Sequence, residues 1–316
     1  MDLPLVTVIC TCYNHGQFIQ ESLDSVLYQR YPRIELIVID NGSRDHSTQE
    51  IHKWWQINNS KLPCTTFFHP QTLNYCHSFN RALRLAKGQY IIDLSGDDIL
   101  LQDHIGSAVE TLEKRQWPVY FSNAYLKNEK NGKVNTFYPL DKHGEITRKI
   151  NSGDIYAHVV KSNYLCAATL VIRREVILKE GGYDEELSYE DFDIIVRLAR
   201  NYSFAFNEHP GVIKRILKAS YAAKQYRIKN SPMLASTLRV CRKIQNMNRT
   251  EAENLALQQR VMFETKHALA SANFGVVKDF LDLGKEIGVS GPMYKIYRSW
   301  DRHRWDLSII YKWIKP

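Results

Sequence analysis

The feature that most constrains this chain is the alternation of short apolar runs with amphipathic segments along its N-terminal part. The apolar runs predict strands at residues 6–10, 35–39, 65–68, 90–94 and 119–122. The segments between them predict helices at residues 17–30, 47–57, 78–86 and 102–115. Nearly continuous apolar strands that alternate with helices are typical of a parallel sheet covered on both faces. The sequence therefore predicts a doubly wound α/β fold with a mostly parallel sheet.

The pattern changes further along the chain. Residues 125–165 are polar and interrupted by glycines, and they predict a segment rich in loops. A helix is expected at 191–201, and further strands are expected at 168–172, 204–206 and 212–216. From residue 218 onward helical spacing predominates, at 232–246, 251–272, 274–287 and 292–313. We therefore predict an α/β domain over 1–217 and a basic, mainly helical region over 218–316.

The composition excludes several classes of protein. The 316 residues are 44% apolar and 24% charged, which excludes a disordered or fibrous chain. No apolar run approaches the roughly 18–20 residues that a helix needs to span a bilayer. Met1–Pro4 has no basic start, so no signal peptide is expected. The six cysteines are scattered, and we expect reduced, mostly buried thiols of a cytosolic protein without a metal role.

The positive charge is concentrated in the last third of the chain. Residues 1–217 contain 24 Lys and Arg against 26 Asp and Glu, whereas residues 218–316 contain 18 against 8, a net charge of +10. If 292–313 is one helix, it carries an apolar stripe flanked by basic residues, formed by Ile296, Trp300, Ile310 and Trp313. Such a helix suits an anionic membrane surface. The structural alternatives are a solvated face or a stripe that packs on protein.

Polar residues follow three of the predicted strands, where the ligands of doubly wound sheets collect. These polar segments are Thr11–Gly16, Asp40–Asp45 and Ser95–Asp98. No G-x-G-x-x-G turn and no P-loop follows any strand, so neither a dinucleotide fingerprint nor an NTPase motif is present. The adjacent carboxylates Asp97 and Asp98 are suited to hold Mg²⁺ or Mn²⁺ together with phosphate. Either residue could instead cap a following helix.

Asp40 and the pair Glu190–Asp191 also allow both a structural and a functional interpretation. Asp40 either starts the Asn41–Gly42 turn or accepts a hydrogen bond from the N–H of a nucleotide base. Glu190 and Asp191 open a predicted helix, where acidic side chains interact favourably with the helix dipole. One of these two carboxylates could instead be a general base.

Four segments together resemble the motifs of family 2 glycosyltransferases. Leu5–Asn14 resembles the opening strand, and Asp40–Asp45 resembles the family's D-D-G-S-x-D turn. Leu94–Asp98 resembles a variant of the D-x-D metal motif, and Gly181–Asp193 resembles the acidic E-D segment on the acceptor side. Each motif is weak alone, but the four occur in the family's order over residues 4–217. On this resemblance the chain is identified as a member of the family.

The resemblance implies a GT-A fold and inverting transfer from a nucleotide-diphosphate sugar. By position, it implies a nucleotide-sugar site formed by Thr11, Tyr13, Asp40, Asn41 and Asp97. Within that site, Thr11 and Tyr13 would line the base pocket, and Asp40 would bind the edge of the base. Asp97 would lie near the ribose and the diphosphate.

The resemblance also implies the chemistry at the reacting bond. Asp98 would bind the metal cofactor, Mn²⁺ or Mg²⁺. Asp191 would be the catalytic base that deprotonates the hydroxyl group of the acceptor.

The chain departs from the family pattern at three places. Asn41 stands where the family has a second aspartate, so hydrogen bonding is kept but a charge is lost. Phe79 stands where the family often has a phosphate-binding arginine, for which Arg81 could substitute. Lys214 and Arg215 occupy the stretch in which a late histidine is expected, and they could supply positive charge to the diphosphate.

We therefore predict a transferase that uses a uridine-linked donor and a glycan or lipid-linked acceptor, in the synthesis of bacterial surface polysaccharide. A cytoplasmic protein with peripheral contact to the inner face of an anionic membrane is expected. Self-association is compatible with the sequence, and binding to nucleic acid is not expected. The alternative is a non-catalytic module that binds nucleotide sugars or glycans, in which Asp191 only caps a helix.

Overall fold

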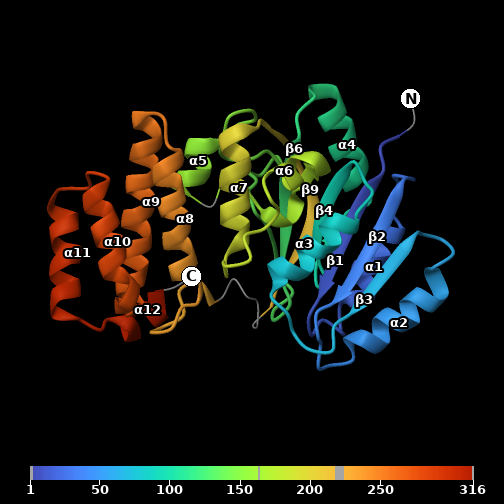
Figure 1. Cartoon of the computed structure of the whole chain (residues 1–316), viewed down its shortest axis with the longest axis horizontal. Helices are drawn as coiled ribbons and strands as arrows, with labels where there is room; N and C mark the ends of the chain where they lie inside the picture. The colour runs from blue at the N-terminus through green and yellow to red at the C-terminus, as the bar shows by residue number, and fades with distance from the viewer. Residues whose placement is uncertain (1–2, 163, 218–223, 315–316) are drawn as a thin grey trace. The chain divides into compact units, whose positions relative to one another are not determined.

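The computed structural model describes residues 3–162, 164–217 and 224–314 (Figure 1). The chain divides into two compact units, which are described separately. The first unit consists of Met1–Ile155, Leu165–Glu185 and Arg197–Leu217. The second unit consists of Tyr156–Tyr164, Glu186–Val196 and Lys218–Pro316. Two segments that precede residue 218 therefore belong to the same unit as the C-terminal region.

The first unit contains one mixed sheet, with nine strands among the described residues. The strands are β1 (Val6–Cys12), β2 (Ile34–Asp40), β3 (Cys64–Phe68), β4 (Tyr90–Ser95), β5 (Ile99–Leu100), β6 (Val119–Asn128), β7 (Val134–Thr136), β8 (Val171–Arg173) and β9 (Phe204–Ile216). Their order is β3-β2-β1-β4-β8-β6-β9-β5, and β7 pairs with β6. Most paired residues lie in the parallel pairs β1–β2, β1–β4, β2–β3 and β6–β9. The predicted α/β sheet is thus confirmed, with short antiparallel additions.

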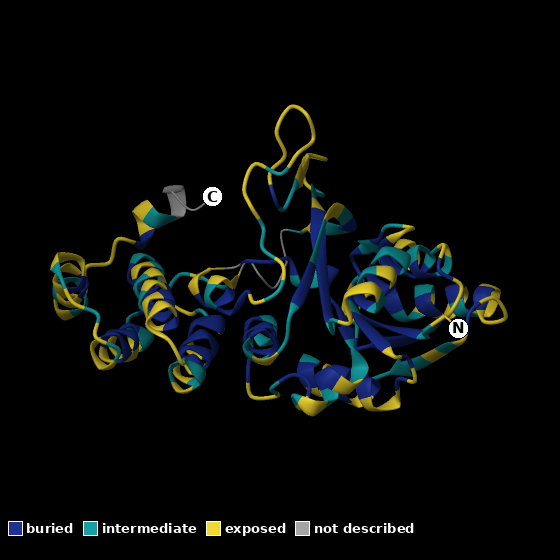
Figure 2. Cartoon of the chain, turned by 90° about the horizontal axis from the view of Figure 1, so that it is seen from above, coloured by how far each residue is buried: buried dark blue, intermediate teal, exposed yellow. Residues whose placement is uncertain are grey.

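The centre of the sheet is covered on both faces, and its strands are buried (Figure 2). The helices of this unit are α1 (Ile19–Leu27), α2 (Ser47–Asn58), α3 (Tyr75–Leu85), α4 (His104–Arg115), α6 (Arg174–Lys179) and the 3₁₀ helix η1 (Ala167–Thr169). On one face, Val6 and Val8 share a core cluster with Leu23 of α1 and Ile105 of α4. Successive side chains alternate between faces, and α3 also packs on β1. A strand buried on both faces must be apolar throughout, as β1 is.

Two strands are longer than the sequence predicted. β6 continues to Asn128 instead of ending at residue 122, so part of the expected loop segment is strand. The two short strands expected near the end of the domain form the single strand β9, which pairs with β6 along its whole length. The register shifts on either side of Asn123. Polar residues in this irregular stretch interrupt the apolar pattern, although the pairing continues.

Gly88 lies between α3 and β4, where the chain passes close to β1. It is not in the left-handed region, and α3 instead ends at Ala86 in an extended conformation. A Cβ atom at Gly88 would lie 2.5 Å from the backbone nitrogen of Thr7. Glycine is therefore required here because the backbone passes close to β1.

The second unit is helical, as predicted. It contains α5 (Tyr156–Lys161), the start of α7 (Glu190–Asn201), α8 (Met233–Met247), α9 (Glu251–Ala270), α10 (Phe274–Glu286), α11 (Pro292–His303) and α12 (Ser308–Ile314). Helix α9 begins with a capping box. The Thr250 hydroxyl accepts from the Glu253 amide, and the Glu253 carboxylate accepts from the Thr250 amide. This reciprocal pair satisfies two amides that a helix start leaves without partners.

The predicted single helix over 292–313 was wrong. Helix α11 ends at Arg304, which has a left-handed conformation with φ 52°, and α12 starts at Ser308. Ile296 and Ile310 are both exposed but lie on different helices. The Trp300 indole donates to the Trp305 carbonyl oxygen, with 2.6 Å between nitrogen and oxygen. The side chain of Trp313 lies outside the described residues, so the four-residue stripe is not a feature of one helix.

Among the described residues, no helix combines the length and the apolar content needed to span a bilayer. All six cysteines are free thiols, and five of them are buried. The predicted burial of most of the cysteines is confirmed.

Candidate active site

The carboxyl ends of β1, β2 and β4 lie side by side in the first unit. Cys12 of β1 pairs with Asp40 of β2, and Thr11 pairs with Ser95 of β4. The polar segments that follow these strands therefore meet at one edge of the sheet. The structure thus brings together six of the candidate residues, namely Thr11, Tyr13, Asp40, Asn41, Asp97 and Asp98.

The loops after β1 and β2 are joined by hydrogen bonds from backbone amides to side chains. The amides of Asn14 and His15 donate to the hydroxyls of Ser43 and Ser47, each at 2.9 Å. The Gly16 amide donates to the Asp45 carboxylate at 2.9 Å. Burial raises the pKa of Asp45, but the hydrogen bonds from Ser47 and Gly16 together lower it by more. The pKa of Asp45 therefore lies below its ordinary value, and the carboxyl group stays charged. Asp45 therefore shapes the loop, a role that the sequence analysis did not assign.

The residues expected around a nucleotide base differ in their burial and in their hydrogen bonds. Asp40 is buried, and its carboxylate accepts from the Ser43 amide at 3.1 Å and from the Thr48 hydroxyl. The Thr11 hydroxyl is buried and has no hydrogen-bond partner in the described part of the chain. Tyr13 is 42% exposed. An unpartnered buried hydroxyl is costly unless a ligand or water completes it.

The amide of Asn41 holds the loop that precedes α3. Its nitrogen donates to the Leu73 carbonyl at 3.0 Å, and its oxygen accepts from the Leu73 amide at 3.2 Å. The same oxygen accepts from the Ser78 hydroxyl at 3.2 Å. A carboxylate has no N–H to donate. The asparagine therefore suits this site better than the aspartate that is usual in the family pattern.

Phe79 belongs to the core and not to a phosphate site. It is fully buried, and its ring lies 4.4 Å from the ring of Tyr183, between centroids. The Tyr183 hydroxyl donates to the Asp93 carboxylate at 2.7 Å, and Asn80 bonds both backbone groups of Tyr183. Arg81, the suggested substitute for an arginine at 79, is placed over the Phe67 ring of β3, the edge strand.

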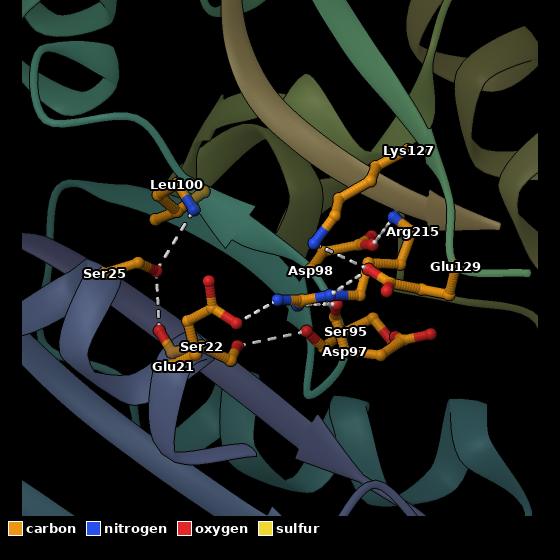
Figure 3. A network of polar contacts seen from close by, with 10 residues as sticks. All are labelled: Glu21, Ser22, Ser25, Ser95, Asp97, Asp98, Leu100, Lys127, Glu129 and Arg215. Carbon is orange, nitrogen blue, oxygen red and sulfur yellow. Dashed lines mark hydrogen bonds and ion pairs between the residues drawn. The ribbon is translucent and has the colours of Figure 1, made fainter. Parts of the chain in front are cut away.

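The turn that contains Asp97 and Asp98 is fixed by Arg215 of β9 (Figure 3). The Arg215 amide donates to the Asp98 carboxylate at 2.9 Å, and its guanidinium donates to the Asp97 carbonyl oxygen. The Asp97 carboxylate accepts from the Ser95 hydroxyl, and Nδ1 of His15 lies 3.8 Å from it. Helix α4 starts only at His104, so neither aspartate caps it. The alternative role as a helix cap is thereby excluded.

The charge of Arg215 is already neutralised within the protein. Its side chain is 1% exposed and pairs with Glu129 at 2.9 Å and with Glu21. The guanidinium also lies over the Phe18 ring, 4.8 Å from its centroid. Arg215 is therefore a structural support of the aspartate turn. Of the two cations predicted to serve a diphosphate, only Lys214 stays a candidate.

The electrostatics of the turn suit a divalent cation. Burial and the neighbouring Asp97 carboxylate raise the pKa of Asp98 to about 7, although Lys214 and Arg215 act in the opposite direction. Within the described residues, no group of three or more Asp, Glu, His or Cys forms a metal site made of protein alone. Mg²⁺ is usually held by one or two carboxylates plus substrate phosphates. Two buried carboxylates with hard oxygen donors fit that arrangement.

The predicted base lies at the start of α7, in a segment of the second unit. Glu190, Asp191 and Asp193 all belong to the first turn. Asp193 is 1% exposed at its side chain and pairs with Lys243 at 2.7 Å, whereas Glu190 and Asp191 are partly exposed. Asp193 is thereby a structural residue, and Glu190 and Asp191 stay the two candidates for the general base.

A family model described as glycosyl transferase family 2 matches residues 7–177, more than half of the chain. The chain belongs to glycosyl transferase family 2. This membership agrees with the four motifs and with the strand ends on which the structure places three of them.

Curated relatives support the same family. An uncharacterized glycosyltransferase of Methanocaldococcus jannaschii is 26% identical over 208 residues, 65% of this chain and 68% of that protein. The Escherichia coli protein named UDP-Glc:alpha-D-GlcNAc-diphosphoundecaprenol beta-1,3-glucosyltransferase WfaP is 30% identical over 131 residues, 40% of this chain. That match covers 49% of WfaP, and a match to a Haemophilus influenzae glycosyltransferase covers 48% of its length. The chain thus spans only part of several relatives.

Solved structures confirm the GT-A fold over nearly the whole chain. TarS of S. aureus, in complex with UDP-GlcNAc, has a TM-score of 0.73 at 15% identity, over 98% of this chain and 91% of that one. The mannosyltransferase PcManGT of Pyrobaculum calidifontis, in complex with GDP-Man and Mn²⁺, has a TM-score of 0.61 at 18% identity, over 100% and 89%. The chain is therefore GT-A in fold, with a helical C-terminal region.

Proposed function

We propose that this chain is an inverting glycosyltransferase that transfers a sugar from a uridine-diphosphate donor to a hydroxyl group of an acceptor. The observation that carries this proposal is the buried Asp97–Asp98 turn, which lies at the same sheet edge as Asp40 and the Thr11 hydroxyl, for which the described residues offer no hydrogen-bond partner. Carboxylates that suit a metal-bound diphosphate therefore lie beside polar groups that suit a nucleotide base. Solved GT-A structures with bound UDP-GlcNAc and GDP-Man support this class of donor.

The donor side divides into a base pocket and a diphosphate site. Thr11 and Tyr13 contact the base, and Asp40 accepts from its N–H. Asn41 acts indirectly, because its amide holds the neighbouring loop. This arrangement favours uracil, which offers an N–H between two carbonyls.

The diphosphate binds at the aspartate turn. Asp98 would hold Mn²⁺ or Mg²⁺, and Asp97 would lie close to the ribose and the diphosphate. The cation would offset negative charge on the departing diphosphate. Lys214, whose charge already acts on Asp98, supplies further positive charge.

On the acceptor side, Asp191 removes the proton of the hydroxyl that attacks the anomeric carbon from the face opposite the nucleotide. The acceptor is a glycan or a lipid-linked glycan of a bacterial surface polysaccharide. The name of WfaP, a relative with a lipid-linked acceptor, supports this choice. A cytoplasmic location with peripheral membrane contact through the basic region 218–316 would bring the enzyme to such an acceptor.

Turnover separates this proposal from a module that only binds sugars. The full chain is incubated with Mn²⁺ and UDP-glucose, UDP-N-acetylglucosamine or GDP-mannose, with water as the acceptor of the sugar, and the nucleoside diphosphate released by this hydrolysis is measured. Asp191→Asn is nearly isosteric and should lower the rate by roughly 10²-fold or more while nucleotide affinity is kept. Glu190→Gln is the matched control and should change the rate little. An Asp191→Asn rate within a few-fold of wild type would exclude Asp191 as the base.

A further inference from the structure

The first turn of α7 is tied to α8 by an ion pair whose carboxylate is buried. Asp193 has a side chain that is 1% exposed, and its carboxylate is 2.7 Å from the ammonium group of Lys243. A charge this deeply buried depends on its partner, because an unpaired carboxylate in the interior is strongly destabilising. The turn therefore cannot shift on α8 without separating the pair.

Arg260 of α9 holds the same turn from another direction. Its guanidinium lies over the ring of Phe192, 4.5 Å from the centroid. The guanidinium is itself fixed, because it pairs with the buried Glu264 at 3.0 Å and donates to the Val160 carbonyl at 3.0 Å. Phe192 thus packs against a rigid cation and not against a mobile surface side chain.

The segment that leads into α7 is held by α8 as well. The Ser188 amide donates to the Ser236 hydroxyl at 2.8 Å, and Arg239 donates to the Glu186 carbonyl at 3.3 Å. All these contacts lie within the second unit. The segment from 186 to 193 is therefore positioned by the C-terminal helices.

We propose that Lys243 and Arg260 are positioning residues that fix the direction of the Asp191 carboxylate, an inference that rests on the proposed role of Asp191 as the base. Consecutive side chains of a helix are about 100° apart. With the side chains at 192 and 193 anchored, the first turn of α7 cannot rotate about its axis, so the Cα–Cβ bond of Asp191 keeps one direction. A base must come within hydrogen-bond reach of its proton, and a misplacement of about 1 Å can cost about 10²-fold in rate. The C-terminal helices are thus part of the catalytic apparatus.

The test uses Lys243, because its side chain is 37% exposed and its replacement disturbs the fold less than replacement of the buried Arg260. Lys243→Met should lower nucleoside-diphosphate release by about tenfold or more, with UDP affinity and binding stoichiometry unchanged. Lys243→Arg keeps the charge and should restore most of the rate. Arg242→Met is the matched control, because Arg242 lies on the same helix as Lys243. The substitution breaks the exposed ion pair with Glu286 of α10 and should leave the rate unchanged.

A purely structural role is distinguished by combining variants. If Lys243 acts through Asp191, Lys243→Met should lower the rate of the Asp191→Asn variant by less than about twofold. An equal loss in both backgrounds would overturn the inference, and so would a wild-type rate for Lys243→Met. Melting temperature and UDP stoichiometry show whether each variant is folded. A wild-type rate for Asp191→Asn would instead contradict the proposed function, so the two failures are separate.

Discussion

At the scale of single residues, Asn41 shows how a departure from the family pattern acquires a physical reason. The sequence alone suggests a lost charge in the turn after β2. In the structure the side-chain amide both donates to and accepts from the backbone of Leu73. A carboxylate cannot donate, so the asparagine preserves a buried connection between two loops that an aspartate would lose.

Asn41→Asp should therefore destabilise the protein. A buried carboxylate would replace the donor to the Leu73 carbonyl, and the two oxygens would face each other. A buried polar group that loses its partner costs about 1–3 kcal/mol. Chemical denaturation at neutral pH measures the loss, with the exposed Asn59→Asp as the control. Equal stability of both variants would show that the amide donor is dispensable.

Arg215 marks the limit of prediction from sequence at this scale. Its place in the chain identified a cation close to the candidate metal site, and the structure bears out that proximity. Its partners Glu21 and Glu129 are 194 and 86 residues away in the chain. No local pattern reports such pairings, so the sequence could not show that its charge is already neutralised. The same holds for Asn80, which binds Tyr183 across 103 residues.

At the scale of elements, β1, β2 and β4 were predictable because their apolar runs match the burial of a covered sheet. The short strands β5 and β7 were not predicted, and the strand expected at 168–172 begins only at Val171, after the 3₁₀ helix η1. The boundaries that failed have local physical causes. β9 continues through polar residues because β6 offers a partner along its length. The break between α11 and α12 depends on the left-handed backbone conformation of Arg304. Arginine rarely adopts this conformation, so the sequence does not predict it.

Gly88 and Gly106 offer a prediction about these elements. Gly88→Ala should destabilise the fold by about 1–3 kcal/mol, because the new methyl would meet the β1 backbone at 2.5 Å. Gly106 lies inside α4 with nothing within 4 Å of a Cβ atom, so Gly106→Ala should stabilise by roughly 0.5–1 kcal/mol. In thermal unfolding, the melting temperature should fall for Gly88→Ala and rise for Gly106→Ala. Shifts of the same sign would contradict this account of Gly88.

At the scale of the whole molecule, the two units are interleaved along the chain. The change in charge and periodicity near residue 217 predicts a domain boundary there. No local pattern assigns residues 156–164 and 186–196 to the helical unit, because that assignment depends on tertiary contacts. The net charge of +10 on residues 218–316 remains the feature of the chain that most suggests an anionic surface as a partner.

Co-sedimentation with vesicles tests the proposed membrane contact. The full chain should bind anionic vesicles and not neutral ones, and added salt should weaken the binding. Each basic residue near such a surface contributes about 1 kcal/mol. A triple alanine variant of exposed cations on α11 should bind about 10²-fold more weakly; its positions are Lys295, Arg298 and Arg302.

The control for that variant removes the same charge from exposed positions in the first unit, at Lys130, Lys133 and Lys142. It should bind anionic vesicles nearly as well as wild type. Equal weakening by both triple variants would indicate a general charge effect. Failure of the full chain to bind anionic vesicles would exclude the membrane contact.

The central claim is that the turn after β4 binds a metal–nucleotide complex, and calorimetric titration with UDP, with and without Mn²⁺, tests it most directly. Wild type should bind UDP more tightly with Mn²⁺. Asp98→Ala should lose this enhancement while its melting temperature shows an intact fold, and the exposed Asp103→Ala should behave as wild type. Replacing a residue that hydrogen-bonds to a metal ligand typically weakens metal binding by roughly 10- to 100-fold. Replacing the proposed metal ligand Asp98 should weaken Mn²⁺-dependent UDP binding by at least that factor. Equal, metal-independent UDP affinity in wild type and Asp98→Ala would contradict the account.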